Sequence, residues 1–482
     1  MRGVEKETFL RCLCGRRRSF RRRYRREERR CRGHRPCLHH HGHHASFGVF
    51  LPLGELPAQP HEIPDDAANG SKDDEPGKPA HAKSIATMQT ELADFIRETP
   101  EGREAESILR KCVHCGFCTA TCPTYQVLGD DLDSPRGRIY LMKRALEGAP
   151  VSDKTRLHLD RCLTCRACET TCPSGVRYGR LVDIGRGVVE SKTRRGPFER
   201  LQRAVLAWGL RKTRLFGLAL GLGRLVPFVN VPAARPAGAW PAPRHRRKML
   251  VLAGCVQPAI APSINAAAAR VLDQAGISLV EVQGAGCCGG IRFHLNYQEE
   301  GRDDMRALID AWWPAVESGE VEAIIMTASG CGVTVKDYGH LLAHDPKYAE
   351  KAARISSLTR DLCEVLTPEM IPDGGDRGSV AFQSPCTLQH GQQLRGKVEA
   401  LLTKAGYSLV PVQDAHLCCG SAGTYSLLHP AISKELRSRK LASLGKPDVI
   451  ATANIGCLTH LQGGTERPVR HWIELLGRRM TP

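Results

Sequence analysis

Eight cysteines between residues 112 and 172 constrain the fold of this 482-residue chain more than any other feature. They form two identical runs, Cys112-x2-Cys115-x2-Cys118-x3-Cys122-Pro123 and Cys162-x2-Cys165-x2-Cys168-x3-Cys172-Pro173. This spacing is typical of [4Fe–4S] binding, because three thiolates two residues apart can close on one face of a cluster. A single Cys-x2-Cys pair would favour zinc, whereas two complete runs ending in Cys-Pro favour iron–sulfur clusters.

In two-cluster proteins the fourth cysteine of each run turns away with its proline and ligates the other cluster. We therefore predict two [4Fe–4S] clusters with exchanged fourth ligands. The first cluster is assigned to Cys112, Cys115, Cys118 and Cys172. The second is assigned to Cys162, Cys165, Cys168 and Cys122.

Helical patterns surround the cysteine runs. Apolar residues at helical spacing predict a helix over residues 89–111. Ser134-Pro135 is an N-cap followed by proline at the first helical position, and it predicts a helix through Leu146. A further helix is expected over 153–161, so residues 88–190 are predicted to form an all-helical two-cluster ferredoxin-type module. Arg136 and Arg138 could tune a cluster, but we interpret them as ordinary solvated helix residues.

The composition narrows the class of protein. An apolar content of 41% and a charged content of 25% are ordinary for a globular chain, and 21 clustered cysteines favour metal ligation in a reducing compartment. The net charge is +18, yet residues 1–44 hold fourteen arginines and one lysine against four glutamates, a net +11. The excess lies in an irregular tail rather than on a folded basic face, which argues against nucleic-acid binding. We expect residues 1–87 to be a disordered extension, and Met88 is a candidate natural start.

Residues 191–246 are predicted to be a helical linker. Its apolar residues between 201 and 222 are interrupted by Arg211, Lys212 and Arg214, so no run is long enough to cross a bilayer. An amphipathic helix of this kind could lie on a membrane surface, pack on the next domain or contact a partner subunit. These three alternatives remain open at the level of sequence.

The second half of the chain contains a duplication. Cys255 and Cys386 each follow an apolar run, and a Cys-Cys-Gly sequence lies 32 residues after each of them, at Cys287 and Cys418. Each copy reads strand, helix, strand, Cys-Cys-Gly turn, helix, strand, cysteine. Agreement at a fixed offset is the sign of two copies of one module. We predict two tandem α/β modules over residues 247–370 and 376–482, so the predicted fold class is multidomain α plus α/β.

Strands that alternate with helices form parallel sheets, and ligands gather at the carboxyl ends of such strands. Four cysteines of each copy follow these ends. They are Cys255, Cys287, Cys288 and Cys331 in the first copy, and Cys386, Cys418, Cys419 and Cys457 in the second. Each set is a candidate site for an additional cluster or a metal ion, whereas inert buried thiols are the alternative.

These parts together resemble a known family. The stretches Met88-Gln-Thr-Glu-Leu-Ala-Asp-Phe-Ile96 and Ile108-Leu-Arg-Lys-Cys-Val-His-Cys-Gly-Phe-Cys-Thr-Ala-Thr-Cys-Pro-Thr-Tyr125 look very close to the iron–sulfur subunits of bacterial glycolate oxidases, also called glycolate dehydrogenases. Ser134-Pro-Arg-Gly-Arg-Ile-Tyr140 does so too, and the likeness covers roughly residues 88–482. The architecture is also similar to subunits of anaerobic glycerol-3-phosphate dehydrogenase, lactate-utilisation proteins and heterodisulfide reductase.

The resemblance implies a subunit of an oxidoreductase complex that acts on CH–OH donors. FAD-bearing partner subunits would oxidise glycolate to glyoxylate, and this chain would pass the electrons towards a quinone acceptor. The expected location is cytoplasmic, with peripheral association at the inner face of the cell membrane. The chain itself would contain no catalytic residue.

Three other interpretations remain. The chain could serve a glycerol-3-phosphate or lactate dehydrogenase complex, or the Cys-Cys-Gly sites could reduce a disulfide or a quinone directly. Alternatively, the clusters could only maintain the shape of a binding module or sense oxidation. In the heterodisulfide reductase type, the last cysteine of a site opens a Cys-x2-Cys. Thr334 and His460 stand at that distance here, so a five-cysteine cluster is doubtful and His460 is a secondary candidate ligand.

Overall fold

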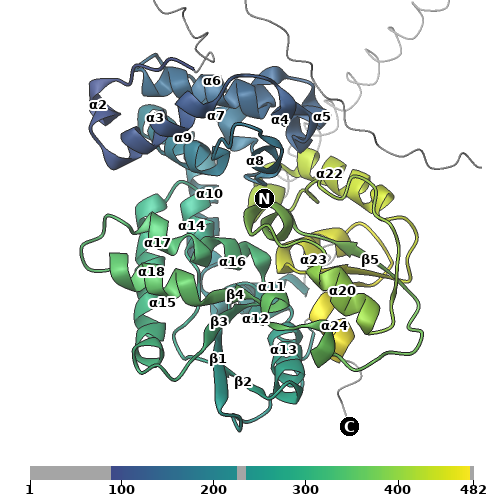
Figure 1. Cartoon of the computed structure of the whole chain (residues 1–482). Helices are drawn as coiled ribbons and strands as arrows, with labels where there is room; N and C mark the ends of the chain where they lie inside the picture. The colour runs from purple at the N-terminus through teal and green to yellow at the C-terminus, as the bar shows by residue number, and fades with distance from the viewer. Residues whose placement is uncertain (1–87, 225–234, 478–482) are drawn as a thin grey trace, which may run out of the picture. The chain divides into compact units, whose positions relative to one another are not determined.

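The computed structural model describes residues 88–224 and 235–477 (Figure 1). The predicted extension over residues 1–87 lies outside the described residues, which begin at the candidate start Met88. Residues 225–234 of the predicted linker also lie outside them. Within the described ranges no strand precedes β1 at Arg247. The helices of the first part are α2 (Asp94–Arg97), α3 (Pro100–Lys111), α4 (Phe117–Ala120), α5 (Pro123–Leu128), η1 (Asp131–Asp133), α6 (Pro135–Leu146), α7 (Asp153–Asp160), α8 (Ala167–Thr171) and α9 (Tyr178–Lys192).

Hydroxyl caps fix where several of these helices begin. The Oγ atom of Ser134 accepts a hydrogen bond from the amide of Gly137, and Pro135 occupies the first turn of α6, as predicted. The prediction of one helix over residues 89–111 is wrong. Thr99 caps α3 in the same way, with Pro100 at its first position, and this separates α3 from the short α2.

The core of the helical part lies where α6 packs against α9. Met142 on α6 and Leu181 on α9 are fully buried. The two helices approach closely at Gly185, where an added Cβ would lie 2.5 Å from the Sδ atom of Met142. This contact braces the segment between the two cysteine runs.

Two further helices follow, α10 (Pro197–Gly209) and α11 (Thr213–Arg224). They lie within residues 191–246, over which the sequence predicts a helical linker, and residues 225–234 of that range are outside the described residues. Across the described ranges, no helix has the length and apolar character needed to span a bilayer.

The first sheet has four parallel strands in the order β2-β1-β3-β4. Its strands are β1 (Arg247–Val251), β2 (Ile277–Glu281), β3 (Ala323–Met326) and β4 (Thr359–Asp361). The connecting helices are α12 (Gln257–Ile260), α13 (Ser263–Gln274), α14 (Gly290–His294), α15 (Gln298–Glu317), α16 (Ser329–Lys336), α17 (Tyr338–Leu341) and α18 (Ala349–Leu358). The predicted mixture of helices and parallel sheet is confirmed.

Both faces of this sheet are covered, which is usual for parallel strands. Met249 and Val251 belong to the apolar cluster that includes α13, whereas Leu250 belongs to the cluster that includes α15. Side chains alternate between the faces of a strand, so consecutive residues of β1 serve different layers. Figure 1 shows α13 and α15 on opposite sides of the sheet.

The second sheet repeats the topology of the first, with parallel strands in the order β6-β5-β7-β8. Its strands are β5 (Ser379–Gln383), β6 (Ser408–Leu409), β7 (Val449–Thr452) and β8 (Val469–His471). Its helices, with two that lead into it, are α19 (Leu362–Val365), η2 (Pro368–Met370), the π-helix η3 (Thr387–Gly391), α20 (Lys397–Lys404), α21 (Tyr425–Leu428), α22 (Pro430–Ser443), α23 (Ile455–Gln462) and α24 (Trp472–Gly477). The fourth strand of each sheet, β4 and β8, was not predicted.

The two sheets share one apolar core. Helix α13 of the first half packs against α24 of the second, and one cluster of buried side chains extends across both sheets. The imidazole of His471 at the end of β8 also lies 2.8 Å from the carbonyl oxygen of Thr327, just beyond β3. The two copies therefore pack into one body rather than standing as separate units.

Candidate functional site

The first cysteine set lines a cavity beside α4 and α6. Cys112, Cys115 and Cys118 from the first run lie around it together with Cys172 from the second. The cavity measures about 430 Å³, including its mouth. Cys115 is exposed, and Cys112 is buried. The structure thus places three thiols of one run beside the last thiol of the other.

The second set has the reciprocal composition. Cys162 and Cys165, with Cys168 between the two cavities, lie around a smaller cavity of about 290 Å³ that Cys122 of the first run also lines. Four sulfur donors at each cavity suit the thiolate coordination that iron–sulfur clusters require. The residues present therefore fit two [4Fe–4S] clusters.

The two cysteine loops adopt the same backbone conformation. The second and fourth residues after the first cysteine of each run have positive φ, with His114 at 54° and Gly116 at 85°, and Thr164 at 52° and Arg166 at 60°. Three of these are not glycine, so the conformation is costly and must be imposed by the loop. It turns amides towards sulfur, as in the hydrogen bond of 3.4 Å from Thr164 N to the Sγ atom of Cys162.

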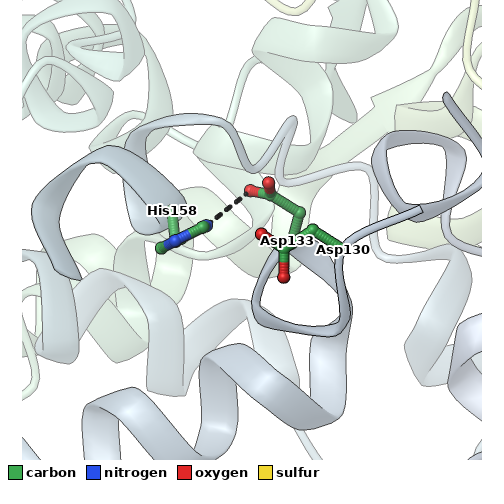
Figure 2. A group of neighbouring side chains, drawn as sticks. All are labelled: Asp130, Asp133 and His158. Carbon is green, nitrogen blue, oxygen red and sulfur yellow. Dashed lines mark ion pairs between the residues drawn. The ribbon is translucent and has the colours of Figure 1, made fainter. Parts of the chain in front are cut away.

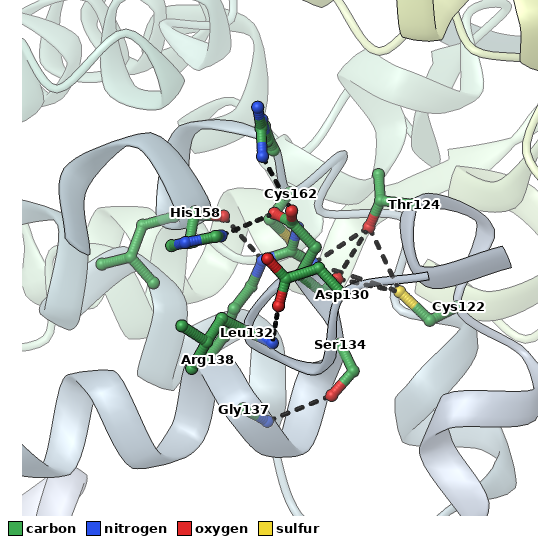
Figure 3. Close-up of polar contacts among 12 residues, drawn as sticks. Cys122, Thr124, Asp130, Leu132, Ser134, Gly137, Arg138, His158 and Cys162 are labelled. Atoms are coloured by element: carbon green, nitrogen blue, oxygen red, sulfur yellow. Dashed lines mark hydrogen bonds and ion pairs between the residues drawn. The ribbon is translucent and has the colours of Figure 1, made fainter. Parts of the chain in front are cut away.

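The second cavity has a buried cation, Arg138. Its side chain is 1% exposed, and its Nη1 lies 4.0 Å from the Sγ of Cys122 and 3.1 Å from the hydroxyl of Thr124 (Figure 3). Its Nε donates to the carbonyl oxygen of His158. The interpretation of Arg138 as a solvated residue is therefore wrong, because its position on α6 points it into the module. Arg136 is 42% exposed and pairs with Asp131.

Arg186 on α9 supplies a second buried charge near the same cavity. It is 7% exposed and donates to the carbonyl oxygens of Leu159 and Cys162. Burial alone would raise the pKa of Cys162, but Arg138 and Arg186 hold it below its usual value. Burial raises the pKa of Cys118 at the first cavity to about 11, and it also raises the pKa values of Cys165 and Cys168 at the second. The influence of the two arginines is therefore seen at Cys162.

Asp133 anchors this charged network. Its carboxylate is fully buried and accepts from Arg138 at 3.2 Å and from Arg161 at 2.9 Å. Asp130, Asp133 and His158 lie close enough together to suggest a cation site, and Figure 2 shows how they approach from α7 and the turn at η1. Two guanidinium groups already neutralise Asp133, however, and they would repel a metal ion. We interpret Asp133 as the centre of an ion-pair network that fixes Arg138, whereas Asp130 accepts a hydrogen bond from the amide of Leu132.

The Cys-Cys-Gly cysteines follow the carboxyl ends of the first three strands of each sheet in chain order, as predicted. In the second copy, Cys386 follows β5, the pair Cys418 and Cys419 follows β6, and Cys457 lies in α23 after β7. The sulfur of Cys386 lies 3.8 Å from that of Cys418, and the sulfur of Cys419 lies 3.3 Å from that of Cys457. Cys255, Cys287, Cys288 and Cys331 occupy the equivalent positions in the first copy.

Backbone geometry explains why a glycine follows each cysteine pair. Gly289 and Gly420 have φ of 80° and 91°, and a Cβ on either would lie within 2.6 Å of a backbone oxygen. Each donates its amide at 3.4 Å to the first cysteine of its pair, Cys287 or Cys418. The turn therefore points an N–H group at a sulfur atom, which stabilises a thiolate.

In these sites, burial and the neighbouring thiols make it harder for a cysteine to ionise. The neighbouring thiol of Cys418 and burial raise the pKa of Cys386, and the thiol of Cys287 and burial do the same for Cys255. Clustered buried thiolates therefore call for a cation to hold them. His460 does not join the second set, because its Nε2 lies 3.2 Å from both the hydroxyl and the carbonyl oxygen of Ser433.

The two Cys-Cys-Gly sites differ in their surroundings. One apolar cluster joins Leu163 and Cys165 of the second cysteine run to Cys386 and Cys418. The phenol of Tyr425 in the second copy also donates to the carbonyl oxygen of Arg161 at 3.0 Å. Cys288 and Cys331 of the first copy pack instead within their own half. The second copy is thus the one whose cysteines contact a cysteine loop of the helical module.

Comparison with known families agrees with this division. The 4Fe-4S dicluster domain family matches residues 108–176, and the cysteine-rich domain family matches residues 249–336 and 380–462. The chain is thus an iron–sulfur protein with two cysteine-rich domains. More narrowly, it belongs to the family of glycolate oxidase iron–sulfur subunits.

The identities with individual proteins support this family assignment. The glycolate oxidase iron-sulfur subunit of Escherichia coli K12 is 53% identical over 401 residues, which cover 81% of this chain and 98% of that protein. The probable glycolate oxidase iron-sulfur subunit of Bacillus subtilis 168 is 29% identical over 79% of this chain and 94% of its own length. Lactate utilization protein A of Geobacillus thermodenitrificans is 25% identical over 48% of this chain and 99% of its own.

Sequence reasoning missed Asp133, His158 and Arg186, which are buried and form the charged network of the second cavity together with Arg138. Arg138 was considered as a residue that could tune a cluster, but it was interpreted as solvated. The Ser134-Pro135 start of α6 locates Arg138 in the first turns of a helix, but no periodic pattern shows that this face turns inwards. Tyr178, whose hydroxyl lies 3.6 Å from the Sγ of Cys162, had no sequence signal.

Proposed function

We propose that this chain is the electron-transfer subunit of a flavin-dependent glycolate oxidase complex. It would take electrons singly from FAD-bearing subunits and deliver them to a quinone. Oxidation of glycolate to glyoxylate releases two electrons and two protons, and a flavin can accept the pair and release electrons one at a time. The protons leave to solvent, and the reduced quinone takes up two protons. The glycolate assignment derives from the similar subunits of E. coli and B. subtilis.

The observation that carries the proposal is the exchange of cysteines between the two cavities. We assign one [4Fe–4S] cluster to Cys112, Cys115, Cys118 and Cys172, and the other to Cys162, Cys165, Cys168 and Cys122. The residues that line the two cavities support this assignment, with Cys168 lining both. When bound, such clusters accept and release single electrons.

The residues around the cavities determine how each cluster behaves. Arg138 and Arg186 place positive charge beside the second cavity, and the amide of Thr164 and the hydroxyl of Tyr178 point at the sulfur of Cys162. Charge and hydrogen bonds of this kind favour the reduced, more negative state. We therefore propose that the second site has the higher reduction potential and receives electrons from the first.

We further propose that the second Cys-Cys-Gly site accepts electrons from the cluster at the second cavity. The packing of Cys165 in one apolar cluster with Cys386 and Cys418 supports this order. Four thiols cluster in that site, and the raised pKa values of Cys386, Cys418 and Cys419 support a metal or cluster there. The first Cys-Cys-Gly site has the same donor set, and we propose a similar ligand for it without a place in the transfer sequence.

The test is a redox titration of the anaerobically purified native complex, followed by EPR, with iron, sulfide and flavin analysis. The proposal expects at least two reversible [4Fe–4S] signals that become reduced on addition of glycolate. Signals that do not respond to glycolate but respond to lactate or glycerol 3-phosphate would reassign the donor. Material without iron and sulfide would refute the electron-transfer role altogether.

A further inference from the structure

One buried histidine, His390, contacts two segments that contain candidate cluster ligands. It lies in the π-helix η3 and is 3% exposed. Its Nδ1 lies 2.9 Å from the hydroxyl oxygen of Thr170, which stands between the third and fourth cysteines of the second run. Its Nε2 lies 2.9 Å from the carbonyl oxygen of His416, two residues before the second Cys-Cys pair. The imidazole therefore joins the loop of the second cavity to the turn of the second Cys-Cys-Gly site.

The partners of His390 determine which of its ring nitrogens has the proton. A carbonyl oxygen only accepts, so Nε2 donates to His416. The Nη2 atom of Arg395 lies 3.4 Å from Nδ1 and can only donate, so Nδ1 is an acceptor and receives the hydrogen bond of Thr170. Burial lowers the pKa of His390, which agrees with a neutral ring. The one donor and the one acceptor of the ring thus bind different modules.

Both partners of this contact belong to the repeat copies that meet. The two Cys-Cys-Gly copies are offset by 131 residues at their first cysteines, and at this offset the counterpart of His390 is Ala259. The two cysteine runs are offset by 50 residues, and the counterpart of Thr170 is Ala120. Neither alanine side chain can form a hydrogen bond. The duplications alone therefore do not account for the imidazole and the hydroxyl.

The turn before the second Cys-Cys-Gly sequence is held by further buried donors. The Nε2 atom of Gln389 donates to the carbonyl oxygen of Ala415 at 2.9 Å. The Nζ atom of Lys440 donates to the carbonyl oxygen of Asp414, also at 2.9 Å. Gln389 is 5% exposed and Lys440 is 3% exposed. These two bonds fix the turn within its own copy, and His390 adds the bond that reaches the cysteine run.

The second cysteine run is attached to the second copy at both of its ends. Tyr425 donates to the carbonyl oxygen of Arg161, directly before the run, and Leu163 packs in one apolar cluster with Cys418. His390 holds the other end through Thr170. A π-helix such as η3 is rare and occurs frequently at functional sites. The relative position of the run and the Cys-Cys-Gly turn is thus fixed by side chains from both modules.

We propose that His390 is a positioning residue that holds the loop of the second cavity against the second Cys-Cys-Gly site, so that single electrons can pass between them. The proposal rests on the electron-transfer function proposed above. The cluster of the second cavity loses one electron and the metal or cluster of the Cys-Cys-Gly site gains it. His390 keeps its proton throughout. A fixed arrangement is required because the rate of electron transfer falls steeply as the separation of the two centres increases.

The first experiment is hydrogen–deuterium exchange of the purified native protein, followed by mass spectrometry. His390→Ala removes both hydrogen bonds, each of which changes a local opening equilibrium by about fivefold. Exchange over residues 166–172 and 414–418 should therefore rise together by at least about tenfold. His390→Gln keeps a donor near the position of Nε2, so exchange should rise over 166–172 but remain close to the parent value over 414–418.

Thr170→Val removes the same contact from the other module, at an exposed position, while keeping the shape of the side chain. It should raise exchange over 166–172, and adding it to His390→Ala should cause no further rise there. The matched control is His460→Ala, because the Nε2 atom of His460 contacts only Ser433 of its own copy among the hydrogen bonds of the described residues. Exchange over 166–172 should then equal that of the parent protein.

A second measurement separates positioning from general damage. The native complex is reduced with glycolate, mixed with a short-chain ubiquinone, frozen at successive times and followed by EPR. In His390→Ala the signal of the second cluster should stay reduced for longer than in the parent protein, because electrons leave it more slowly. The iron content and the midpoint potentials of both ferredoxin-type clusters should be unchanged, since no cysteine ligand is altered.

Two results would overturn the proposal. One is parent-like exchange over residues 166–172 in His390→Gln and Thr170→Val. The other is raised exchange with a second cluster that is reoxidised at the parent rate. The exchange measurement requires neither donor nor acceptor. Clusters that do not respond to glycolate would therefore contradict the proposed function, while the exchange result would still decide whether His390 holds the two segments together.

Discussion

Arg138 should set the reduction potential of the cluster at the second cavity. Its guanidinium lies 4.0 Å from the Sγ of Cys122, and it is almost fully buried. A unit charge at about 4 Å interacts with another by about 4 kcal/mol at an effective dielectric constant of about 20. Asp133 offsets part of this charge, so we take about half, roughly 2 kcal/mol. Because a tenfold change for one electron corresponds to about 59 mV, Arg138→Met should lower the midpoint by roughly 90 mV.

The assay is a potentiometric EPR titration of the variant and the parent protein. Arg138→Lys retains the charge and should recover most of the lost potential. The matched control is Arg144→Met, because Arg144 lies on the same helix but is exposed. Removing Arg138 leaves Asp133 paired with Arg161, so the module should still fold, and iron analysis would verify it. An Arg138→Met protein with both clusters intact and both midpoints unchanged would refute the electrostatic account.

The remaining predictions concern the Cys-Cys-Gly sites and the pH dependence of stability. Cys386→Ser should alter the EPR signal of the second cluster, whereas Cys255→Ser should not, because only the former contacts its loop. Gly420→Ala should lower the free energy of unfolding in urea by about 2 kcal/mol or more, because its Cβ would lie 2.6 Å from the carbonyl oxygen of Ser433 at a φ of 91°. Burial lowers the pKa of His471 to about 4 from a usual 6.5. The contribution of neutral His471 to the free energy of unfolding is therefore complete above pH 6.5. It falls by about 1 kcal/mol per pH unit as the pH is lowered towards 4. In urea titrations at several pH values, His471→Gln should reduce this pH dependence.

Matched substitutions separate these effects from general ones. Gly175→Ala also introduces a side chain at positive φ, 63°, but nothing lies within 4 Å of its Cβ, so it should cost less than Gly420→Ala. Equal costs would show that the close contact is irrelevant. His344→Gln changes an exposed histidine and should leave the pH slope intact. A His471→Gln protein that keeps the parent slope would contradict the burial argument.

The sequence predicts those parts of the fold whose residues have one structural role. Cysteines at ligand spacing, the duplicated Cys-Cys-Gly sequence and apolar runs between helices each led to the helical and parallel-sheet architecture. The start of a separate helix at Thr99 could also have been predicted, because Thr99-Pro100 has the same N-cap and proline pattern as Ser134-Pro135. Apolar residues at helical spacing at both ends of residues 89–111 favoured one helix over that local signal.

Other features depend on tertiary packing and lie beyond a single sequence. Strands β4 and β8 are three residues each, too short for a periodic pattern. Arg138 is buried because Asp133 and the loop at Cys122 surround it, and an arginine in a helix is ordinarily solvated. The apolar residues between 201 and 222 were visible in the sequence, but only the folded structure shows which of them are exposed.

The exchange of fourth ligands is the central claim, and EPR of two cysteine variants tests it most directly. Anaerobically purified Cys122→Ser and Cys172→Ser proteins would be titrated beside the parent protein. The account predicts that Cys122→Ser changes the signal of the cluster held by Cys162, Cys165 and Cys168, and that Cys172→Ser changes the other signal. If each substitution instead damages the cluster of its own run, the exchange is refuted.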